Sequence, residues 1–349
     1  MTRKTARRGN NVVTIRDVAR HAGVSPMTVS RVVNGETNVR EPTRAKVAAS
    51  IKALHYSPNL AARSLASADA IRIGLLYSNP SAAYLSEFLV GSLEQSSLSG
   101  CQLLIEKCDG PKGERAAVEK LIAAGAGGVV LPAPLCDSET VLKALTAAGV
   151  PAVAVGPARL SEALSAVSID DFEGAKAMTR HLLALGHRDI ALIRGVANHI
   201  SSQQRERGFR AAMAEAGVAV AESRIAQGQF TYRSGLDAAE CLLTGETRPT
   251  AIFACNDDMA AATVAAAHRL HLEVPGDLTV AGYDDTALAT SVWPTLTTVR
   301  QPIAEMARTA VLLLVEQIRR QRAGLAPEVS HRMLKFSLIK RDSAAPPGK

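Results

Sequence analysis

Polar side chains stand just after several aliphatic runs of the sequence, where a buried strand would end. Asn79, Asn256 and Asp284 each follow such a run within two positions. Apolar packing does not explain an amide or a carboxylate at these places. A carboxylate such as Asp284 can accept hydrogen bonds from two neighbouring hydroxyls of a ligand, and an amide can both donate and accept. These residues are therefore candidates for binding a small hydroxylated molecule.

The segments that carry these residues alternate between short aliphatic runs and amphipathic stretches, with a second series beginning after Asp171. The expected strands are 71–77, 102–106, 128–131, 151–155, 189–193, 250–254 and 278–282. The expected helices are 84–98, 113–124, 138–148, 172–185, 202–216, 233–244, 257–270 and 302–321. Such alternation gives parallel sheets covered by helices, with ligands beyond the carboxyl ends of the strands. We predict a two-lobed α/β body with two parallel-sheet subdomains and a ligand cleft.

A second group of candidate residues lies near the N-terminus. Thr14 suits the N-cap of a first short helix, and Gly23 can end that helix with a positive φ. Ser25 can cap the next helix, and Pro26 suits its first turn. Two short helices joined by a turn that contains glycine form a helix-turn-helix. The N-terminus is therefore predicted to be an all-α helix-turn-helix head.

The outward side chains of the second short helix have the chemistry to contact DNA. Arg31 can pair with guanine O6 and N7 in the major groove. Short hydroxyl side chains such as Thr28 suit phosphate contacts, which fix register without reading sequence. The alternative is a generic helical hairpin in a larger core. The expected DNA-contacting residues of the head are Thr14, Ser25, Pro26, Met27, Thr28, Ser30, Arg31 and Asn34.

The net charge of +7 is concentrated in the N-terminal part of the chain. Residues 1–67 contain 12 Lys or Arg and 3 Asp or Glu, whereas the remainder contains 28 basic and 30 acidic residues. A basic block joined to a nearly neutral body is typical of a nucleic-acid-binding head. The alternative is a solvated tail, which residues 1–11 alone would satisfy.

Several other classes of protein are disfavoured. The five cysteines show neither a CxxC motif nor metal-type spacing, which indicates reduced thiols in the cytoplasm. No apolar segment follows the basic N-terminus, and no uninterrupted apolar run of about 18 residues exists, so we expect neither a secretion signal nor a membrane span. No nucleophile-and-base set is evident. We expect a cytoplasmic non-enzyme without a cofactor or a metal.

Three further signals have simpler interpretations. The glycine-rich run 125–128 precedes a strand instead of opening a helix, so we expect a turn and not a phosphate loop. His268 and His271 have metal-like spacing but no third ligand. Asp284 and Asp285 are adjacent, and adjacent carboxylates rarely flank a scissile bond. We expect Asp285 to be structural.

The run from Thr14 to Ala66 resembles the DNA-binding head of the LacI/GalR family of repressors. It contains VSPMTVSRVVN at 24–34 and then Tyr56-Ser-Pro-Asn, followed by an Ala-rich stretch that ends in Leu-Ala. Phrases typical of the family's effector-binding core recur later in the chain. They are His181-Leu-Leu-Ala-Leu-Gly-His187, Arg205-x-x-Gly-Phe209, Asn256-Asp257, Gly282-Tyr-Asp-Asp-Thr286 and Leu296-Thr-Thr-Val-Arg-Gln301. The resemblance covers essentially the entire chain.

The resemblance implies a role for residues 58–66 that their spacing does not show. They would form a hinge helix that becomes ordered when two subunits sit on DNA. Leu65 would wedge into the minor groove, where kinked DNA offsets the cost of unstacking. Asn59 and Arg63 are also expected to contact DNA. The alternative is a simple Ala-rich tether.

The resemblance also places Arg205, Phe230, Asn256 and Asp284 where family members contact their effector, and Asn79 joins them as a strand-end residue. Arg205 can donate a charge-assisted bond, and Phe230 offers an apolar face to a sugar ring. For Asn256 the alternative is a strand-end cap.

The chain departs from carbohydrate-responsive relatives at Gly156 and Pro157, where an acidic side chain is frequent. The strand end 131–134 is apolar as well. We therefore expect a less polar, roomier first wall and a larger glycoside or oligosaccharide as effector. A nucleoside or purine corepressor is the alternative within the same architecture.

These observations together predict a repressor that binds a palindromic operator as a homodimer under the control of a small effector. The alternatives from other classes are a sugar-binding receptor of the periplasmic type and an enzyme of carbohydrate metabolism. The C-terminus has no leucine heptad, so we expect no coiled-coil tetramer.

The expected boundaries are a basic tail at 1–11, the head at 12–57, the hinge at 58–69, the body at 70–343 and a tail at 344–349. Within the body, we expect an N-subdomain of 70–170 and 302–328 and a C-subdomain of 171–299 and 329–343.

Overall fold

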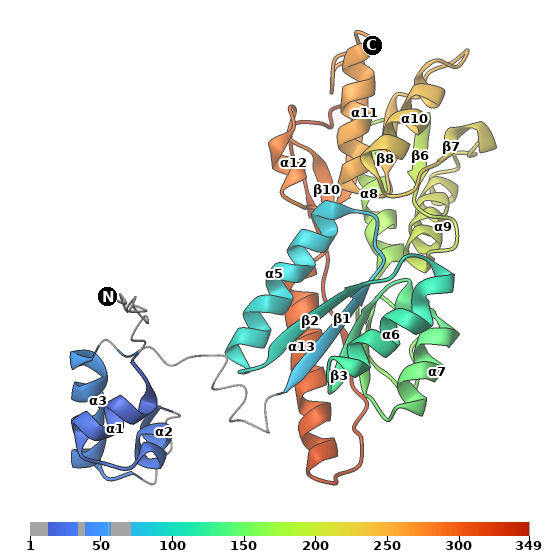
Figure 1. The fold of residues 1–349 in the computed structure, drawn as a ribbon. Coiled ribbons are helices and arrows are strands. Elements are labelled where there is room, and N and C mark those ends of the chain that lie inside the picture. The colour runs from blue at the N-terminus through green and yellow to red at the C-terminus, as the bar shows by residue number, and fades with distance from the viewer. Residues whose placement is uncertain (1–12, 34–38, 55, 57–70, 349) are drawn as a thin grey trace, which may run out of the picture. The chain divides into compact units, whose positions relative to one another are not determined.

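The computed structural model describes residues 13–33, 39–54, 56 and 71–348. The chain divides into two compact units, Met1–Ala70 and Ile71–Lys349 (Figure 1). The expected hinge at 58–69 lies outside the described residues.

The first unit contains three helices, α1 (Ile15–Ala22), α2 (Pro26–Val33) and α3 (Glu41–Ala53). Their apolar faces enclose a small core. Its buried members are Val18, Ala19, Ala22, Val29 and Val47. His21 Nδ1 lies 3.0 Å from Ser50 Oγ, which links α1 to α3. The predicted helix-turn-helix is confirmed, with a third helix packed across it.

The turns of this unit follow from local sequence. The Thr14 amide donates to Asp17 Oδ2 at 2.9 Å, and this closes the first turn of α1. Gly23 ends α1 with φ 62°, a left-handed conformation that glycine adopts without a steric penalty. Ser25 Oγ accepts from the Thr28 amide at 3.1 Å at the start of α2.

The second unit has two lobes, and the first is built on a six-stranded parallel sheet in the order β11-β5-β4-β3-β1-β2. The strands are β1 (Arg72–Tyr77), β2 (Gln102–Lys107), β3 (Gly128–Pro132), β4 (Ala152–Val155), β5 (Ser165–Ser168) and β11 (His331–Met333). The helices are α5 (Ala82–Leu98), α6 (Glu114–Ala123), α7 (Glu139–Ala147) and α13 (Ile303–Arg322). Short 3₁₀ turns, η1 (Pro111–Gly113) and η2 (Leu135–Asp137), follow β2 and β3.

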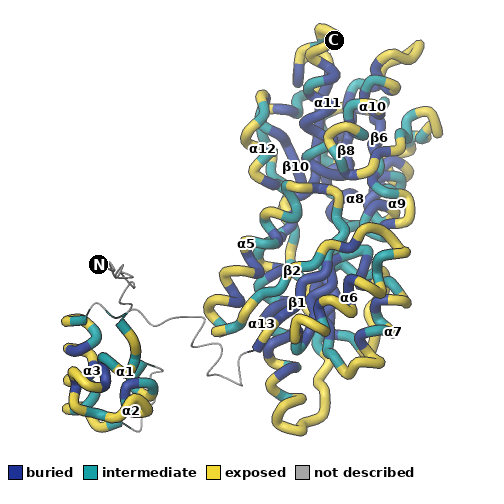
Figure 2. Tube along the Cα trace, viewed as in Figure 1, coloured by how far each residue is buried: buried dark blue, intermediate teal, exposed yellow. Residues whose placement is uncertain are grey.

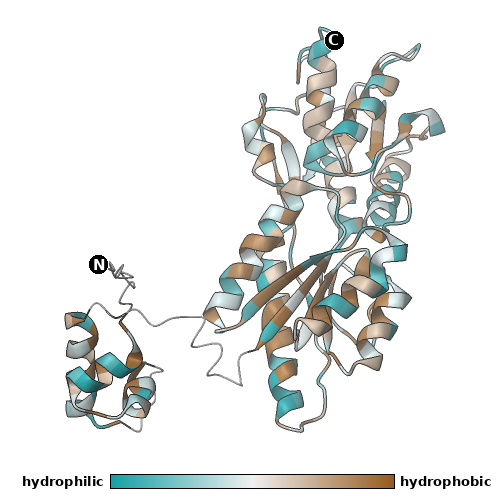
Figure 3. Cartoon of the chain, in the orientation of Figure 1, coloured by the Kyte–Doolittle hydropathy of each residue, from teal (hydrophilic) through white to brown (hydrophobic). Residues whose placement is uncertain are grey.

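Alternate residues of the central strands bury opposite faces of this sheet. Leu75 and Val130 belong to the core that includes Phe88 of α5 and Val311 of α13. Leu76, one position on from Leu75, belongs instead to the core under α6 and α7. Because helices cover both faces, the central strands of the sheet are continuous apolar runs; β1, for example, appears dark blue in Figure 2 and brown in Figure 3.

The second lobe repeats this plan with the strand order β12-β10-β9-β8-β6-β7, in which β12 alone is antiparallel to its neighbour among the described strands. The strands are β6 (Ile190–Arg194), β7 (Ile225–Gln227), β8 (Ala251–Ala254), β9 (Thr279–Asp284), β10 (Thr297–Arg300) and β12 (Ser337–Ile339). The helices are α8 (Asp171–Ala184), α9 (Ile200–Glu215), α10 (Tyr232–Leu243), α11 (Asp257–Arg269), α12 (Leu288–Ser291) and the 3₁₀ turn η3 (Glu222–Arg224). The two predicted parallel-sheet subdomains are thereby confirmed.

The chain passes between the lobes three times, at 169–170, 301–302 and 334–336. The last passage differs from the expected boundary, because β11 pairs with β5 and so residues 331–333 lie in the first lobe's sheet. All three β11 residues are exposed, so no apolar pattern marked them as a strand.

The expected tail at 344–349 also differs from what the described residues show. The Ala345 carbonyl accepts from His187 Nε2 at 2.8 Å and from Thr279 Oγ1 at 3.0 Å, which fixes this segment on the second lobe. In the same described residues, no helix has both the length and the apolar character needed to cross a membrane.

Candidate DNA-binding face and effector cavity

The exposed side of α2 carries the side chains that we expect to contact DNA. Met27 and Arg31 are exposed, whereas Val29 is fully buried on the opposite side. Thr28 and Ser30 are half-buried. The Ser25 and Thr28 hydroxyls lie 2.9 Å apart, so these two donors share a hydrogen bond within the cap.

Of the remaining residues that we expect to contact DNA, only two lie within the described part of the chain. Thr14 is exposed at the start of α1, and its hydroxyl donates to Asp17 Oδ2 at 2.6 Å. Pro26 is exposed in the first turn of α2. Asn34, Asn59, Arg63 and Leu65 lie outside the described residues.

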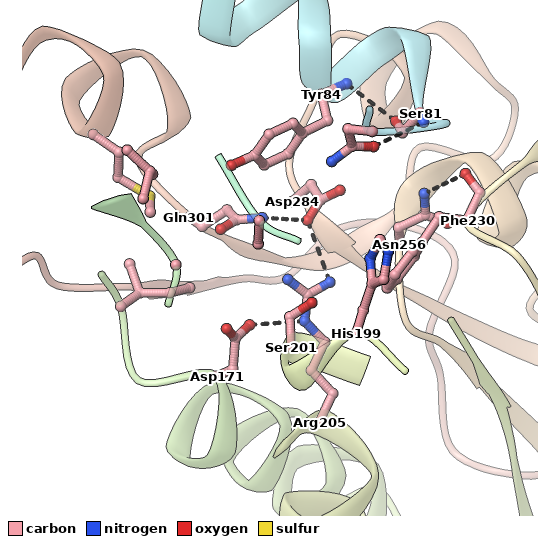
Figure 4. A pocket seen from close by; sticks show the side chains of 16 residues that line it. Ser81, Tyr84, Asp171, His199, Ser201, Arg205, Phe230, Asn256, Asp284 and Gln301 are labelled. Atoms are coloured by element: carbon pink, nitrogen blue, oxygen red, sulfur yellow. Dashed lines mark hydrogen bonds and ion pairs between the residues drawn. The ribbon is translucent and has the colours of Figure 1, made fainter. Parts of the chain in front are cut away.

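A cavity lies between the two lobes, at the carboxyl ends of the strands (Figure 4). It encloses about 570 Å³ between atoms, including the space at its mouth. All five residues that we expected to contact an effector line it. Its polar and aromatic lining is Asn79, Ser81, Tyr84, Asp171, His199, Ser201, Arg205, Phe230, Asn256, Asp284 and Gln301.

Arg205 is the buried cation of this cavity. It projects from α9, and its Nε donates to Asp171 Oδ1 at 2.8 Å. Its Nη1 donates to the Cys255 carbonyl and lies 3.5 Å from Asp284 Oδ1. Burial acts to lower the pKa of Arg205, but Asp171, Tyr283 and Asp284 hold it above its ordinary value. The guanidinium therefore stays charged and fixed in direction.

Asp284 is the carboxylate that faces Arg205 at the end of β9. Gln301 Nε2 donates to its Oδ1 at 2.6 Å, and its backbone has φ 111°. Burial raises the pKa of Asp284 to about 7, against the opposing effects of Arg205 and of the Gln301 bond. A strained backbone and a carboxylate that is costly to ionise are typical of binding sites, where function outweighs stability.

Asn256 has a capping role, which was the alternative to ligand binding that the sequence left open. Its Oδ1 accepts from the Met259 amide at 3.0 Å and so caps α11. Its Nδ2 donates to the Phe230 carbonyl at 3.0 Å, which supports the positive φ of 59° at Phe230. Both the oxygen and the nitrogen of the Asn256 side-chain amide already have protein partners. A ligand that contacts Asn256 would therefore have to share these atoms with the protein.

Phe230 is held with its ring against the cavity. An added Cβ at Gly195 would overlap the ring, so the absence of a side chain there allows the ring to lie directly on the backbone. The His199 ring centroid lies 5.9 Å from that of Phe230, and the Arg205 guanidinium carbon also lies 5.9 Å from it.

The sequence did not identify Tyr84, Asp171, His199, Ser201 or Gln301 as lining residues. Asp171 and Gln301 lie at two of the passages between the lobes, which only the tertiary fold reveals. Tyr84 enters the cavity from the first turn of α5 (Figure 4). The family-like motif from Leu296 to Gln301 was the one signal in the sequence that could have identified Gln301 as a lining residue. Asp285, expected to be structural, is paired with Arg300 and Arg341.

The part of the first lobe's wall that is formed by the ends of β3 and β4 is apolar, as expected, whereas Asn79, Ser81 and Tyr84 of the same lobe add polar groups. Ala133, Val155 and Gly156 line the apolar part, and Pro157 lines an adjoining groove. None of these residues offers a side-chain hydrogen bond to a ligand.

A hydrogen bond joins the lobes beside the cavity. The Ser81 hydroxyl, at the N-cap of α5, donates to Asp258 Oδ2 in the first turn of α11 at 2.7 Å. Burial raises the pKa of Asp258, while the bond from Ser81 acts to lower it. Among the described residues, no other side-chain hydrogen bond connects the two lobes away from the three passages.

Two family profiles match the chain. The profile described as bacterial regulatory proteins, lacI family, matches residues 14–59, and that of a periplasmic binding protein-like domain matches 179–344. The catabolite control protein A of Priestia megaterium is 33% identical over 88% of this chain and 93% of its own length. The HTH-type transcriptional repressor PurR of Pectobacterium carotovorum is 34% identical over 89% of this chain and 92% of its own.

Solved structures show the same fold. The lac repressor dimer bound to operator and the anti-inducer ONPF has a TM-score of 0.76 and 28% identity, covering 95% of this chain and 99% of that one. A complex of the transcriptional regulator CelR with cellobiose has a TM-score of 0.71 and 30% identity, covering 95% of this chain and 100% of that one. The chain belongs to the LacI family of bacterial regulatory proteins, which are DNA-binding transcriptional regulators and not enzymes.

We expect Asp284→Asn to raise the melting temperature at pH 8, and to raise it less at pH 5, where only part of the proton-linked stability has been lost. Burial lifts the pKa of Asp284 from its ordinary 3.8 to about 7, so the folded state retains a proton that the unfolded state loses between these values. The stability linked to this proton is fully present below the unfolded pKa and is lost as pH rises through the folded pKa. Asparagine stays neutral and avoids that loss. Calorimetry across the pH range measures the difference.

The neighbouring Asp285→Asn is the control. Asp285 Oδ2 lies 2.6 Å from Arg300 Nε, and its Oδ1 lies 2.6 Å from Arg341 Nη2. Removing this paired charge should lower the melting temperature at both pH values. A melting temperature of Asp284→Asn below that of the unsubstituted protein at pH 8 would contradict our account of the Asp284 carboxylate.

We expect Ser81→Ala to loosen both sides of the cleft. Loss of the bond to Asp258 should speed amide hydrogen exchange at the start of α5 and, across the cleft, at the start of α11. Ser138→Ala is matched to it, because Ser138 also caps a helix, α7, and donates to Glu114, but within one lobe. That variant should affect only α7 and the start of α6, both in the first lobe. Unchanged exchange at 257–262 in Ser81→Ala would refute the role of the Ser81 bond in holding the lobes together.

Proposed function

We propose that this regulator is a repressor whose affinity for its operator is set by a small effector bound between the lobes. The observation that supports this most is the buried pair of Arg205 and Asp284 in the interlobe cavity. Burying charge is costly, and a buried ion pair is a poor way to stabilise a fold. A pair kept at a strained strand end is better explained by recognition of a ligand.

The effector that suits this cavity is a neutral, hydroxylated molecule, in the class of a sugar or glycoside. Asp284 can accept from adjacent hydroxyls, and Arg205 can donate to a ring or hydroxyl oxygen. Phe230 presents an apolar face of the kind that stacks on a sugar ring. The related regulator solved in complex with cellobiose supports this class.

A nucleoside or purine is the second candidate. Tyr84 and Phe230 provide two aromatic rings in one cavity, which would suit a planar base. Asp284 could accept hydrogen bonds from the hydroxyls of a ribose equally well. Direct binding measurements are therefore needed to distinguish a sugar from a nucleoside as the effector.

We infer that DNA is bound by two copies of the chain. One recognition helix reads only a few base pairs, and a two-fold palindrome doubles the contacts. Exposed apolar side chains on α5 and β2 supply a surface that a second copy would cover. They are Val90, Leu93, Leu98 and Ile105. The relative solved as a dimer on operator supports this arrangement.

The proposed link between head and body is the segment 58–69. In this proposal it forms a hinge on DNA, with Leu65 wedged in the minor groove and with Asn59 and Arg63 on the duplex. An effector that favours one arrangement of the lobes would change the spacing of the two heads. We place the protein in the cytoplasm, where DNA is accessible and its five free cysteines stay reduced.

We expect the purified protein to select a palindromic duplex from a random library and to bind it with a steep salt dependence. Arg31→Ala should weaken this binding by about 1–3 kcal/mol and relax the base preference at one position of each half-site. Fluorescence anisotropy of a labelled duplex measures both. Arg115→Ala is the control, because Arg115 lies on α6 of the body and pairs with Glu119.

Unchanged affinity and base preference in Arg31→Ala would exclude Arg31 from base readout. Failure of the unsubstituted protein to enrich any duplex, with or without sugars and nucleosides, would contradict the proposed function itself.

A further inference from the structure

A second cavity opens beside the first, on the outer side of the cleft. It is formed by the loops that follow β1, β2, β3 and β4 in the first lobe and by the loop between β6 and α9 in the second. It encloses about 1650 Å³ between atoms, including open space at its mouth. Since ligands of α/β sheets bind at the carboxyl ends of strands, this cavity occupies a position suited to binding.

The two cavities are joined at Asn79 and His199, which line both of them. Asn79 Oδ1 accepts from the Ser81 amide at 2.9 Å, which directs the oxygen to the protein and leaves the amide protons for a ligand. A molecule that extends from the inner cavity into the outer one would pass beside these two side chains.

His199 has the chemistry to recognise such a passing group. Burial, and then the charge of Arg205, lowers the pKa of His199, so the imidazole is neutral near pH 7. A neutral imidazole has one donor and one acceptor nitrogen. Within the described residues, neither ring nitrogen of His199 has a protein hydrogen bond. Both nitrogens are therefore available for a glycosidic oxygen or a neighbouring hydroxyl.

The charges of the two cavities disfavour a phosphorylated ligand. The inner cavity has Arg205 against Asp171 and Asp284. The outer cavity has Lys107 against three carboxylates, Asp109, Glu114 and Asp137. Lys107 is already paired with Asp109 at 2.7 Å. A phosphate dianion would meet an excess of carboxylates in the outer cavity, and in the inner cavity it would meet Arg205 already paired with Asp171 at 2.8 Å.

The polar groups of the outer cavity are arranged for a neutral ligand. Asp137 accepts the Ala158 amide with both oxygens, at 2.9 and 3.1 Å, and this fixes the loop after β4. Asn198 is exposed on the opposite wall. Fixed carboxylates and an exposed amide are the groups that bind the hydroxyls of sugars, as in the inner cavity.

We propose that the effector contains at least two joined sugar units without phosphate, one in the inner cavity and one in the outer cavity, with Asn79 and His199 at the link. This inference rests on the proposed function, because it assigns a carbohydrate to the inner cavity. It goes further in assigning the outer cavity, the linkage-reading residues and the exclusion of phosphorylated sugars.

The test is calorimetric titration of the full chain with cellobiose, maltose, trehalose and sucrose. The comparison ligands are glucose, fructose, glucose 6-phosphate and trehalose 6-phosphate. We expect at least one neutral disaccharide to bind about tenfold or more tightly than its component monosaccharides, and phosphorylation to weaken binding by a similar factor.

Asn198→Trp should fill the outer cavity from its exposed wall. It should weaken disaccharide binding about tenfold while leaving monosaccharide binding unchanged. Lys107→Ala removes a side chain of the outer cavity and should weaken disaccharide binding selectively. Lys143→Ala is its matched control, an exposed lysine paired with Glu139 that lines neither cavity. Thermal unfolding of each variant checks that it folds.

The inference is overturned if no neutral disaccharide binds better than its monosaccharides, or if Asn198→Trp weakens both kinds of sugar equally. If monosaccharides still bind in that case, the proposed carbohydrate effector survives without the outer site. If adenosine or hypoxanthine binds and no sugar does, the proposed effector class fails together with this inference.

Discussion

A guanidinium buried between two lobes is the constraint on which the rest of the cleft depends. A charge of this kind is tolerated only when carboxylates and carbonyls surround it. Asp171 supplies one partner from the passage that opens α8, the Cys255 carbonyl supplies another from the end of β8, and Asp284 lies beyond at the end of β9. Three separate segments of the second lobe are therefore held in register around Arg205. The cation in turn fixes the direction in which a ligand's oxygens must point.

The arrangement that preorganises the ligand site also lowers the stability of the folded protein. Asp284 and Phe230 both have positive φ, a conformation that costs about 1–3 kcal/mol for residues other than glycine. Burial also makes the Asp284 carboxylate costly to ionise near neutral pH. These costs leave a site whose donors and acceptors are already in place, so a ligand need not reorganise them. The bond from Ser81 to Asp258 holds the first lobe against this prepared site.

How much was predictable differs between the fold and the site. Alternating aliphatic and amphipathic runs predicted the long strands and helices of both lobes, because sheets covered on both faces need continuous apolar strands. The short strands β5, β7, β10, β11 and β12 were not predicted. Strands β7, β11 and β12 have no buried residue, and the mostly buried β5 and β10 are only four residues long and contain Ser or Thr instead of an aliphatic run. Asn79 and Asp284 were found as polar residues at strand ends, whereas Arg205 and Phe230 came from the family resemblance. Tyr84 and His199 could not be found, since their place over the cavity depends on how the two lobes meet.

Regulation requires that the cleft and the head respond to each other, although they lie in separate compact units. The connection that we propose is thermodynamic: an effector that favours one arrangement of the lobes changes operator affinity, and the operator must change effector affinity by the same factor. The most direct measurement is a titration of effector with and without saturating operator, together with a titration of operator with and without saturating effector. Our account predicts equal factors in the two experiments, of about 5- to 150-fold. Tight binding of effector in the cleft with an operator affinity that does not change would contradict it.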